Sequence, residues 1–170
     1  KTASVPLTVA LSSHIWENLR NAAREPEITD LANCLIAMGA EIEGLGSDRL
    51  VIQGKPTLNG ADYSVMPDRI ETGTYMAAAA LTGGDLTLTG TTTSTLGAVV
   101  EAMERTGVEI NDDGNGRVRV WRNGARLKGT DVTTLPYPAF PTDMQAQFMA
   151  IMATAEGASL ITETIFENRF

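Results

Sequence analysis

The aspartate at position 143 stands where a rigid turn meets a predicted helix, a setting that fixes a carboxylate in place. Pro138 and Pro141 stiffen the approach, because each proline fixes φ near about −65° and disfavours helix in the residue before it. Thr142 or Asp143 can then offer a side-chain oxygen to the unpaired N–H groups of the helix, where the dipole favours a carboxylate. From these residues alone, N-capping is the favoured interpretation of Asp143.

Two helices are predicted from buried stripes at helical spacing. The helix after Asp143 has the stripe Met144, Phe148, Ile151, Met152 and Ala155. An earlier helix begins near Pro26, ends at Gly39 and has the stripe Ile28, Leu31, Leu35 and Ile36. Cys34 lies inside this earlier helix, and we interpret it as a small buried thiol rather than a reactive one.

Composition limits the class of protein. The chain has 170 residues, 43% hydrophobic and 20% charged, as in a globular protein of one or two domains. Its single cysteine, Cys34, excludes an internal disulfide and, with only His14 beside it, disfavours a structural zinc site. No apolar run approaches the roughly 20 residues of a membrane span, and no signal-peptide pattern is visible, so a cytosolic protein is expected.

Net charge is −8, which disfavours a nucleic-acid partner. A small anionic molecule remains possible, because net charge says little about a local arginine cluster.

A repeat organises the chain. The pair Glu41-Ile42 recurs as Glu109-Ile110, each after a helix and a glycine, and the strand at 49–53 recurs at Val118 and Val120. A further helix opens at Pro67-Asp68-Arg69 and leads to a strand at 86–89; its counterpart opens at 141–143 and leads to a strand at 159–164. The unit is therefore about 70 residues long, helix–strand–helix–strand–strand.

The repeat sets the expected domain organisation. Residues 1–66 are interpreted as the last repeat of one globular domain, with residues 1–20 atypical, and 67–170 as the first one and a half repeats of a second. A repeat with unpaired faces cannot bury its apolar side alone. We therefore expect a fragment of a larger protein or a truncated gene product, with self-association through the exposed apolar faces.

Four stretches in register resemble the UDP-N-acetylglucosamine enolpyruvyl transferase family. They cover about 150 residues and are NAAREPEI at 21–28, PDRIETGT at 67–74, FPTDMQAQF at 140–148 and ITETIFENRF at 161–170. The family's fold, an inside-out α/β barrel built from repeats of about 70 residues, is therefore expected here in incomplete form.

The resemblance implies transfer of enolpyruvyl from phosphoenolpyruvate to the 3-hydroxyl of UDP-N-acetylglucosamine, the first committed step of peptidoglycan synthesis. It implies no metal or organic cofactor. The chemistry is addition followed by elimination, which needs a base for the hydroxyl, an acid for the methylene and cations for the carboxylate and phosphate.

The resemblance also assigns roles. Asp143 matches the proposed base, and Ile165 a position whose backbone carbonyl binds the N-acetylglucosamine moiety, with Phe166 packing beside it. Arg169 resembles an arginine that faces the phosphoenolpyruvate carboxylate. A charged lining of the interdomain cleft, through substrate contact or ion-pair scaffolding, is expected from Arg24, Glu25, Glu27, Asp68, Arg69 and Glu71.

The sequence also departs from the family. Ser4 and Val5 resemble part of a uridine-binding turn, but Pro6 replaces its glycine. The family's Lys-Asn pair and its loop with a catalytic cysteine and an arginine would lie upstream, a late arginine and aspartate would lie downstream, and Cys34 does not match that cysteine. We therefore expect the isolated chain to be inactive.

Two alternatives stay open. One is the shikimate-pathway enolpyruvyl transferase, which shares the fold. The other is a non-catalytic, truncated paralogue that binds a UDP-sugar or a partner surface.

Overall fold

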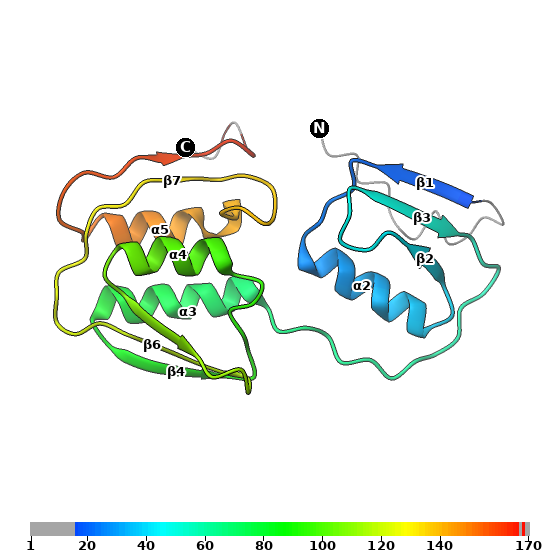
Figure 1. Cartoon of the computed structure of the whole chain (residues 1–170), viewed down its shortest axis with the longest axis horizontal. Helices are drawn as coiled ribbons and strands as arrows, with labels where there is room; N and C mark the ends of the chain where they lie inside the picture. Colours follow the sequence, from blue (N-terminus) through cyan, green and yellow to red (C-terminus); the bar gives the residue numbers. More distant parts are fainter. Residues whose placement is uncertain (1–15, 167, 169–170) are drawn as a thin grey trace. The chain divides into compact units, whose positions relative to one another are not determined.

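The computed structural model describes residues 16–166 and residue 168, and the chain divides into two compact units, Lys1–Met66 and Pro67–Phe170 (Figure 1). The border falls where Pro67 blocks helix in the residue before it. The assignment of these units to repeats of two larger domains stays a prediction. None of the helices among the described residues has the length and apolar character needed to cross a bilayer.

The first unit is an antiparallel sheet with one helix beside it (Figure 1). Its strands are β1 (Trp16–Arg20), β2 (Glu41–Glu43) and β3 (Arg49–Gln53), and their order is β1-β3-β2. The helix α2 (Pro26–Ala37) has its proline in the first turn, where the missing N–H costs no hydrogen bond.

The buried side of α2 differs from the predicted stripe. Ala32 is fully buried and Leu35 packs partly buried beside it, whereas Leu31 and Ile36 are 47% and 38% exposed. Cys34, predicted to be buried, is half-buried. The physical reason is that Ala32 packs in one buried cluster with Ile42 of β2 and Ile52 of β3, and this cluster does not extend to Leu31 or Ile36.

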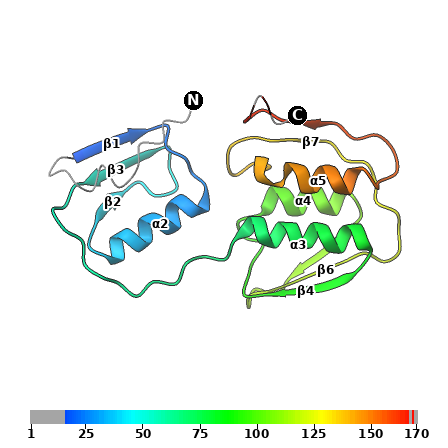
Figure 2. The same ribbon diagram turned by 180° about the vertical axis from the view of Figure 1, so that it is seen from behind.

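The second unit is larger and layered. Figures 1 and 2 show α3, α4 and α5 side by side, with the β4-β6-β5 sheet on one side and the β7-β8 pair on the other. The elements are α3 (Arg69–Thr82), β4 (Asp85–Thr89), α4 (Gly97–Arg105), β5 (Glu109–Asp112), β6 (Arg117–Trp121), β7 (Val132–Thr133), the 3₁₀ turn η1 (Thr142–Met144), α5 (Gln145–Met152) and β8 (Ile161–Thr162).

The core of this unit lies between the helices and the sheet. Met76 from α3, Met103 from α4 and Val120 from β6 are fully buried in it, together with Phe148 from α5. Phe148 meets Phe140 edge to face, with ring centroids 5.3 Å apart. The predicted stripe is confirmed for Met144, Phe148 and Ile151, each 1% exposed. Met152 and Ala155 are only partly buried, and Ala155 lies beyond α5, which ends at Met152.

The internal repeat is confirmed by strand register. Ile42 lies opposite Ile52 in the β2–β3 pair, and Ile110 lies opposite Val120 in the β5–β6 pair. The strand β1 pairs with β3 as β4 pairs with β6, antiparallel in both cases. The sequence shows no clean period at Ser12–Glu17, so β1 comes from the structure. The alternating stretch Leu7–Leu11 lies outside the described residues.

The parallel pair β7–β8 differs from the expectation more than the other strands do. β8 occupies only Ile161–Thr162 of the strand expected at 159–164, and its parallel partner β7 was not predicted. Two-residue strands carry too little alternation to be recognised from sequence.

Glycine in the middle of α3 lets the turn before α5 approach closely. A Cβ built on Gly73 would lie 2.8 Å from Sδ and 2.9 Å from Cε of Met144, and Met144 is 1% exposed. Met144 directly follows Asp143, so this contact positions the turn that carries the candidate base.

Substituting Gly73 should therefore destabilise the protein. Gly73→Ala gains about 1 kcal/mol in helix propensity. The thioether end of Met144 must move to admit the new methyl group, and because Met144 is 1% exposed we expect an overpacking cost above that gain, within about 1–3 kcal/mol. We expect urea unfolding to show a net loss for Gly73→Ala and no loss for Gly97→Ala, because no atom lies within 4 Å of a Cβ at Gly97. Equal or greater stability of Gly73→Ala would contradict the close packing.

Candidate active site

Asp143 lies in η1, between a half-buried Thr142 and a buried Met144, and is itself exposed. Pro141 holds the extended approach with φ −74° and ψ 138°. The predicted N-cap is wrong, because Met144 occupies the N-cap position of α5 and makes no side-chain cap hydrogen bond. The 3₁₀ turn satisfies the backbone instead, through the N–H of Met144 donating to the Pro141 carbonyl at 3.0 Å. The carboxylate of Asp143 is therefore presented at the surface of a fixed turn.

Ile165 and Phe166 follow β8 and are 36% and 53% exposed. Their backbone N–H groups donate to Oε1 of Glu163, at 2.7 Å from Ile165 and 3.1 Å from Phe166. This is a local side-chain-to-backbone turn, in which one carboxylate oxygen organises the two residues that follow.

Glu163 also reaches the turn of Asp143. Its Oε2 accepts a hydrogen bond from Oγ1 of Thr142 at 2.9 Å. Glu163, which the sequence analysis did not single out, thus links the turn that contains Asp143 to Ile165 and Phe166.

The electrostatics of Glu163 favour its ionised form. Burial alone would raise the pKa of the carboxyl, but the N–H groups of Ile165 and Phe166 and the hydroxyls of Thr142 and Thr134 more than offset this and lower the pKa to about 2. Glu163 is therefore a carboxylate throughout the neutral range.

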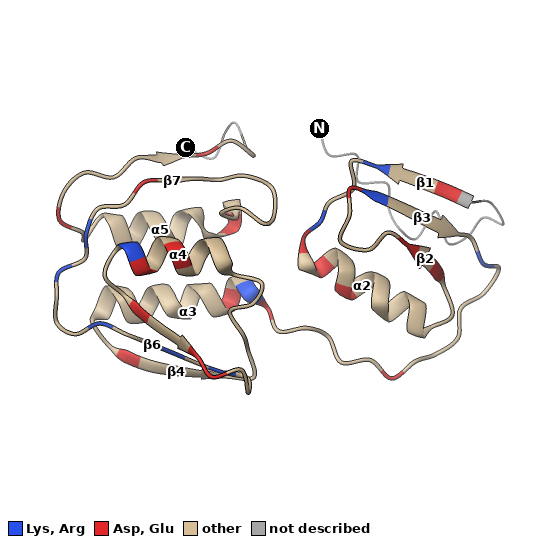
Figure 3. Cartoon of the chain, viewed as in Figure 1, with Lys and Arg blue, Asp and Glu red and all other residues tan. Residues whose placement is uncertain are grey.

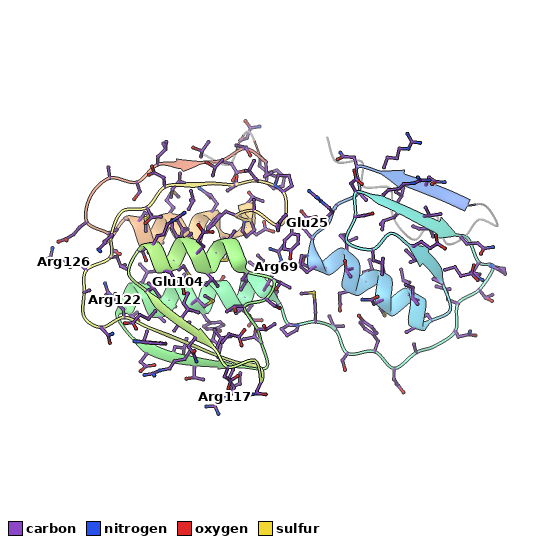
Figure 4. All side chains as sticks on the ribbon, in the orientation of Figure 1. Glu25, Arg69, Glu104, Arg117, Arg122 and Arg126 are labelled. Atoms are coloured by element: carbon purple, nitrogen blue, oxygen red, sulfur yellow. The ribbon has the colours of Figure 1, made fainter. Side chains whose placement is uncertain are left out.

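The charged residues expected to line a cleft lie in both units. Arg24 and Glu27 are exposed beside the start of α2, and Glu25 is the residue before that helix. Figure 4 labels Glu25 there and Arg69 at the start of α3. Glu71, also in α3, is exposed. A cleft lined by these side chains stays a prediction.

Two residues of that set have interactions within the second unit. Asp68 is the N-cap of α3 and accepts from the N–H groups of Ile70 at 2.8 Å and Glu71 at 3.0 Å. Arg69 is 5% exposed, and its guanidinium carbon lies 5.7 Å from the ring centroid of Tyr137. The Asp68 carboxylate thus stabilises the first turn of α3.

Three predicted site residues, Ser4, Val5 and Arg169, lie outside the described residues. Within residues 16–166 and 168, no group of three or more histidine, cysteine, aspartate or glutamate side chains could hold a metal ion. Figure 3 shows acidic and basic residues spread over the elements of both units rather than gathered in a basic stripe.

The missed residues, Glu163 and Thr142, leave only a weak signal in the sequence. An acid that precedes two exposed residues after a strand is a candidate for a side-chain-to-backbone turn. Its long-range contact with Thr142 has no sequence signature, because it depends on how the segment after β8 passes the start of α5.

The pKa of Glu163 predicts an acid-dependent stability. Because the folded value of about 2 lies below the ordinary value of 4.5, the stabilisation is fully present above pH 4.5 and is lost as pH falls toward 2. The measurement is the free energy of unfolding in urea for the wild type and for Glu163→Gln at each pH. We expect the difference between the two proteins to be about 1–2 kcal/mol larger at pH 6 than at pH 2.5. Asp112, whose pKa is also lowered to about 2, is present in both proteins and cancels. A difference in unfolding free energy that does not change with pH would contradict the lowered pKa of Glu163.

Comparison with known proteins assigns the family. The model of the EPSP synthase (3-phosphoshikimate 1-carboxyvinyltransferase) family matches residues 7–170. The chain is 63% identical over 150 residues to UDP-N-acetylglucosamine 1-carboxyvinyltransferase of Gluconobacter oxydans, covering 88% of this chain and 35% of that protein. It is 56% identical over 166 residues to the protein of the same name from Methylorubrum extorquens, covering 98% of this chain and 38% of that one.

A solved structure agrees with the fold. The crystal structure of the enolpyruvyl transferase NikO from Streptomyces tendae matches with a TM-score of 0.82 and 28% identity, over 96% of this chain and 39% of that one. The predicted α/β fold of the enolpyruvyl transferase type is confirmed, and the described residues do not close its barrel. The chain therefore belongs to the EPSP synthase (3-phosphoshikimate 1-carboxyvinyltransferase) family of transferases and is similar, within it, to UDP-N-acetylglucosamine 1-carboxyvinyltransferases.

Proposed function

We propose that this chain contributes the acceptor side of an enolpyruvyl transferase that acts on UDP-N-acetylglucosamine and phosphoenolpyruvate. The observation that carries the proposal is the hydrogen-bonded link between the turn of Asp143 and the segment Ile165–Phe166, made by Glu163 within one unit. The names of relatives that are 55–63% identical support the choice of acceptor.

Asp143 takes the proton of the sugar 3-hydroxyl in this proposal. A base must reach its proton within about 3 Å, and the exposed side chain of Asp143 lies on a turn that a sugar hydroxyl can approach from solvent. The oxygen then bonds to C2 of phosphoenolpyruvate as C3 gains a proton. Loss of a proton from C3 and of phosphate from C2 completes the addition–elimination and leaves the enolpyruvyl ether.

The other predicted site residues bind the two substrates in this proposal. The backbone carbonyl of Ile165 holds the N-acetylglucosamine moiety with Phe166 beside it, and Arg169 faces the carboxylate of phosphoenolpyruvate. Ser4 and Val5 contact the nucleotide. No metal or organic cofactor takes part. The reaction would supply peptidoglycan synthesis in the cytoplasm.

The test has to distinguish the proposed function from two alternatives. The description of the family model favours 3-phosphoshikimate as a second acceptor to assay. A non-catalytic protein would bind the UDP-sugar without turnover.

The test is phosphate release from phosphoenolpyruvate by the protein expressed from the complete reading frame that encodes this chain. We expect release with UDP-N-acetylglucosamine and not with 3-phosphoshikimate. Release only with 3-phosphoshikimate would replace the proposed acceptor, and binding of UDP-N-acetylglucosamine without release would favour the non-catalytic function.

Asp143→Asn should lower kcat about 10²- to 10⁴-fold, because the amide cannot accept the proton. The thermal unfolding midpoint of Asp143→Asn, measured beside kcat, separates loss of the base from loss of the fold. Asp48→Asn, in the exposed turn between β2 and β3, is the matched control and should retain full turnover. Wild-type kcat in Asp143→Asn would show that Asp143 is not the base.

A further inference from the structure

The carboxylate of Glu163 uses both of its oxygens to join two segments. Oε2 accepts from the hydroxyl of Thr142, the residue before the candidate base, and Oε1 accepts from the backbone N–H groups of Ile165 and Phe166. The three donor–acceptor distances are 2.9, 2.7 and 3.1 Å, all in the range of well-formed hydrogen bonds. One side chain therefore fixes where the turn and the segment lie relative to each other.

Each segment also has contacts that do not involve Glu163. On one side, Met144 is 1% exposed and packs against Gly73 of α3. On the other side, Thr134 is fully buried; its N–H donates to the Thr162 carbonyl at 2.9 Å, and its Oγ1 accepts from the N–H of Thr164 at 3.0 Å. The hydroxyl of Thr164 also donates to the Thr134 carbonyl. The packing of Met144 and the hydrogen bonds of the Thr134 backbone remain when the Glu163 carboxylate is removed, so its removal should shift the segments without unfolding the unit.

The negative charge of Glu163 strengthens the hydrogen bonds that link the turn to the segment Ile165–Phe166. Hydrogen bonds to an ionised acceptor are shorter and stronger than those to a neutral one, so a carboxylate holds three donors more tightly than an amide could. A neutral glutamine can still accept from the two backbone N–H groups, but its amide nitrogen would face Thr142 as a donor. In Glu163→Gln the segment Ile165–Phe166 would therefore keep its hydrogen bonds, and the turn would lose the hydrogen bond from Thr142 to a carboxylate.

We propose that Glu163 is a positioning residue, which sets the distance between the carboxylate of Asp143 and the sugar-binding segment Ile165–Phe166. This rests on the proposed function, because Asp143 has to be the base and Ile165 a sugar contact for the distance to matter. Glu163 itself touches neither substrate nor reacting atoms. A misplacement of about 1 Å in such a pair costs on the order of 100-fold in rate.

The test compares kcat with the dissociation constant for UDP-N-acetylglucosamine in the protein from the complete reading frame. Thr142→Val keeps the shape of the side chain and removes the hydroxyl that bonds to Glu163. We expect it to lower kcat about 10- to 100-fold, with an unchanged dissociation constant measured by calorimetry, since the segment Ile165–Phe166 keeps its hydrogen bonds. Thr142→Ser restores the hydroxyl and should recover most of the lost turnover.

Two further variants complete the design. Glu163→Ala removes the hydrogen bonds from Thr142, Ile165 and Phe166 together, so we expect it to lower kcat at least as far and also to weaken UDP-N-acetylglucosamine binding several-fold. Thr154→Val, which removes a hydroxyl that donates to the Ile151 carbonyl at the other end of α5, is the matched control and should leave both quantities unchanged.

A double-mutant cycle separates positioning from a structural role. In the Asp143→Asn background no base remains to be positioned, so adding Thr142→Val should change kcat less than twofold. A full additive loss in that background, or a wild-type kcat in Thr142→Val alone, would overturn the positioning role. If Asp143→Asn alone retains wild-type turnover, the proposed base fails, and that outcome is distinguishable from failure of the positioning role.

Discussion

Burial of the apolar side of α5 against α3 is the constraint on which the candidate site depends. Phe148 and Ile151 are each 1% exposed, and Met144 enters the space that Gly73 leaves open. Because helices pack to near-crystalline density, this contact leaves little freedom to the turn that precedes α5. Asp143 is thus positioned by Met144, its buried neighbour in the chain, and the N-cap position of α5 is occupied by Met144.

Carboxylates hold several of the loops in the second unit. Asp68 caps α3, and Asp112 accepts from the N–H groups of Thr93 at 2.7 Å and Gly114 at 2.9 Å. Glu163 does the same after β8 and adds a contact far away in sequence. In each case the acid accepts from backbone N–H groups that no strand or helix pairs, and for Asp112 and Glu163 these hydrogen bonds lower the pKa of the carboxyl. Part of the acidic excess of the chain therefore serves the fold rather than recognition of a cationic partner.

The repeat explains how the unit can be both regular and functional. The β2–β3 and β5–β6 pairs share one register, and each is joined by a further antiparallel strand. The candidate site lies elsewhere, at η1 and after β8, where a pair of very short parallel strands replaces the regular pattern. Regular repeats supply the packed helices and sheet, and irregular connections between them supply exposed, fixed polar groups.

The sequence alone determined the elements whose periodicity is long enough to read. The bounds of β3, the start of α3 at Asp68, the buried residues Val118 and Val120 and the stripe of α5 all follow from local spacing, and resemblance of four stretches gave the family. Tertiary structure decided the rest. It left Leu31 and Ile36 exposed, replaced the expected N-cap at Asp143 by a 3₁₀ turn, and paired β7 with β8. It also joined Glu163 to Thr142, a hydrogen bond between residues that only the packing of α5 and the path after β8 bring within 2.9 Å. Such contacts have no local pattern, because the free energy that selects them comes from burial across the whole unit.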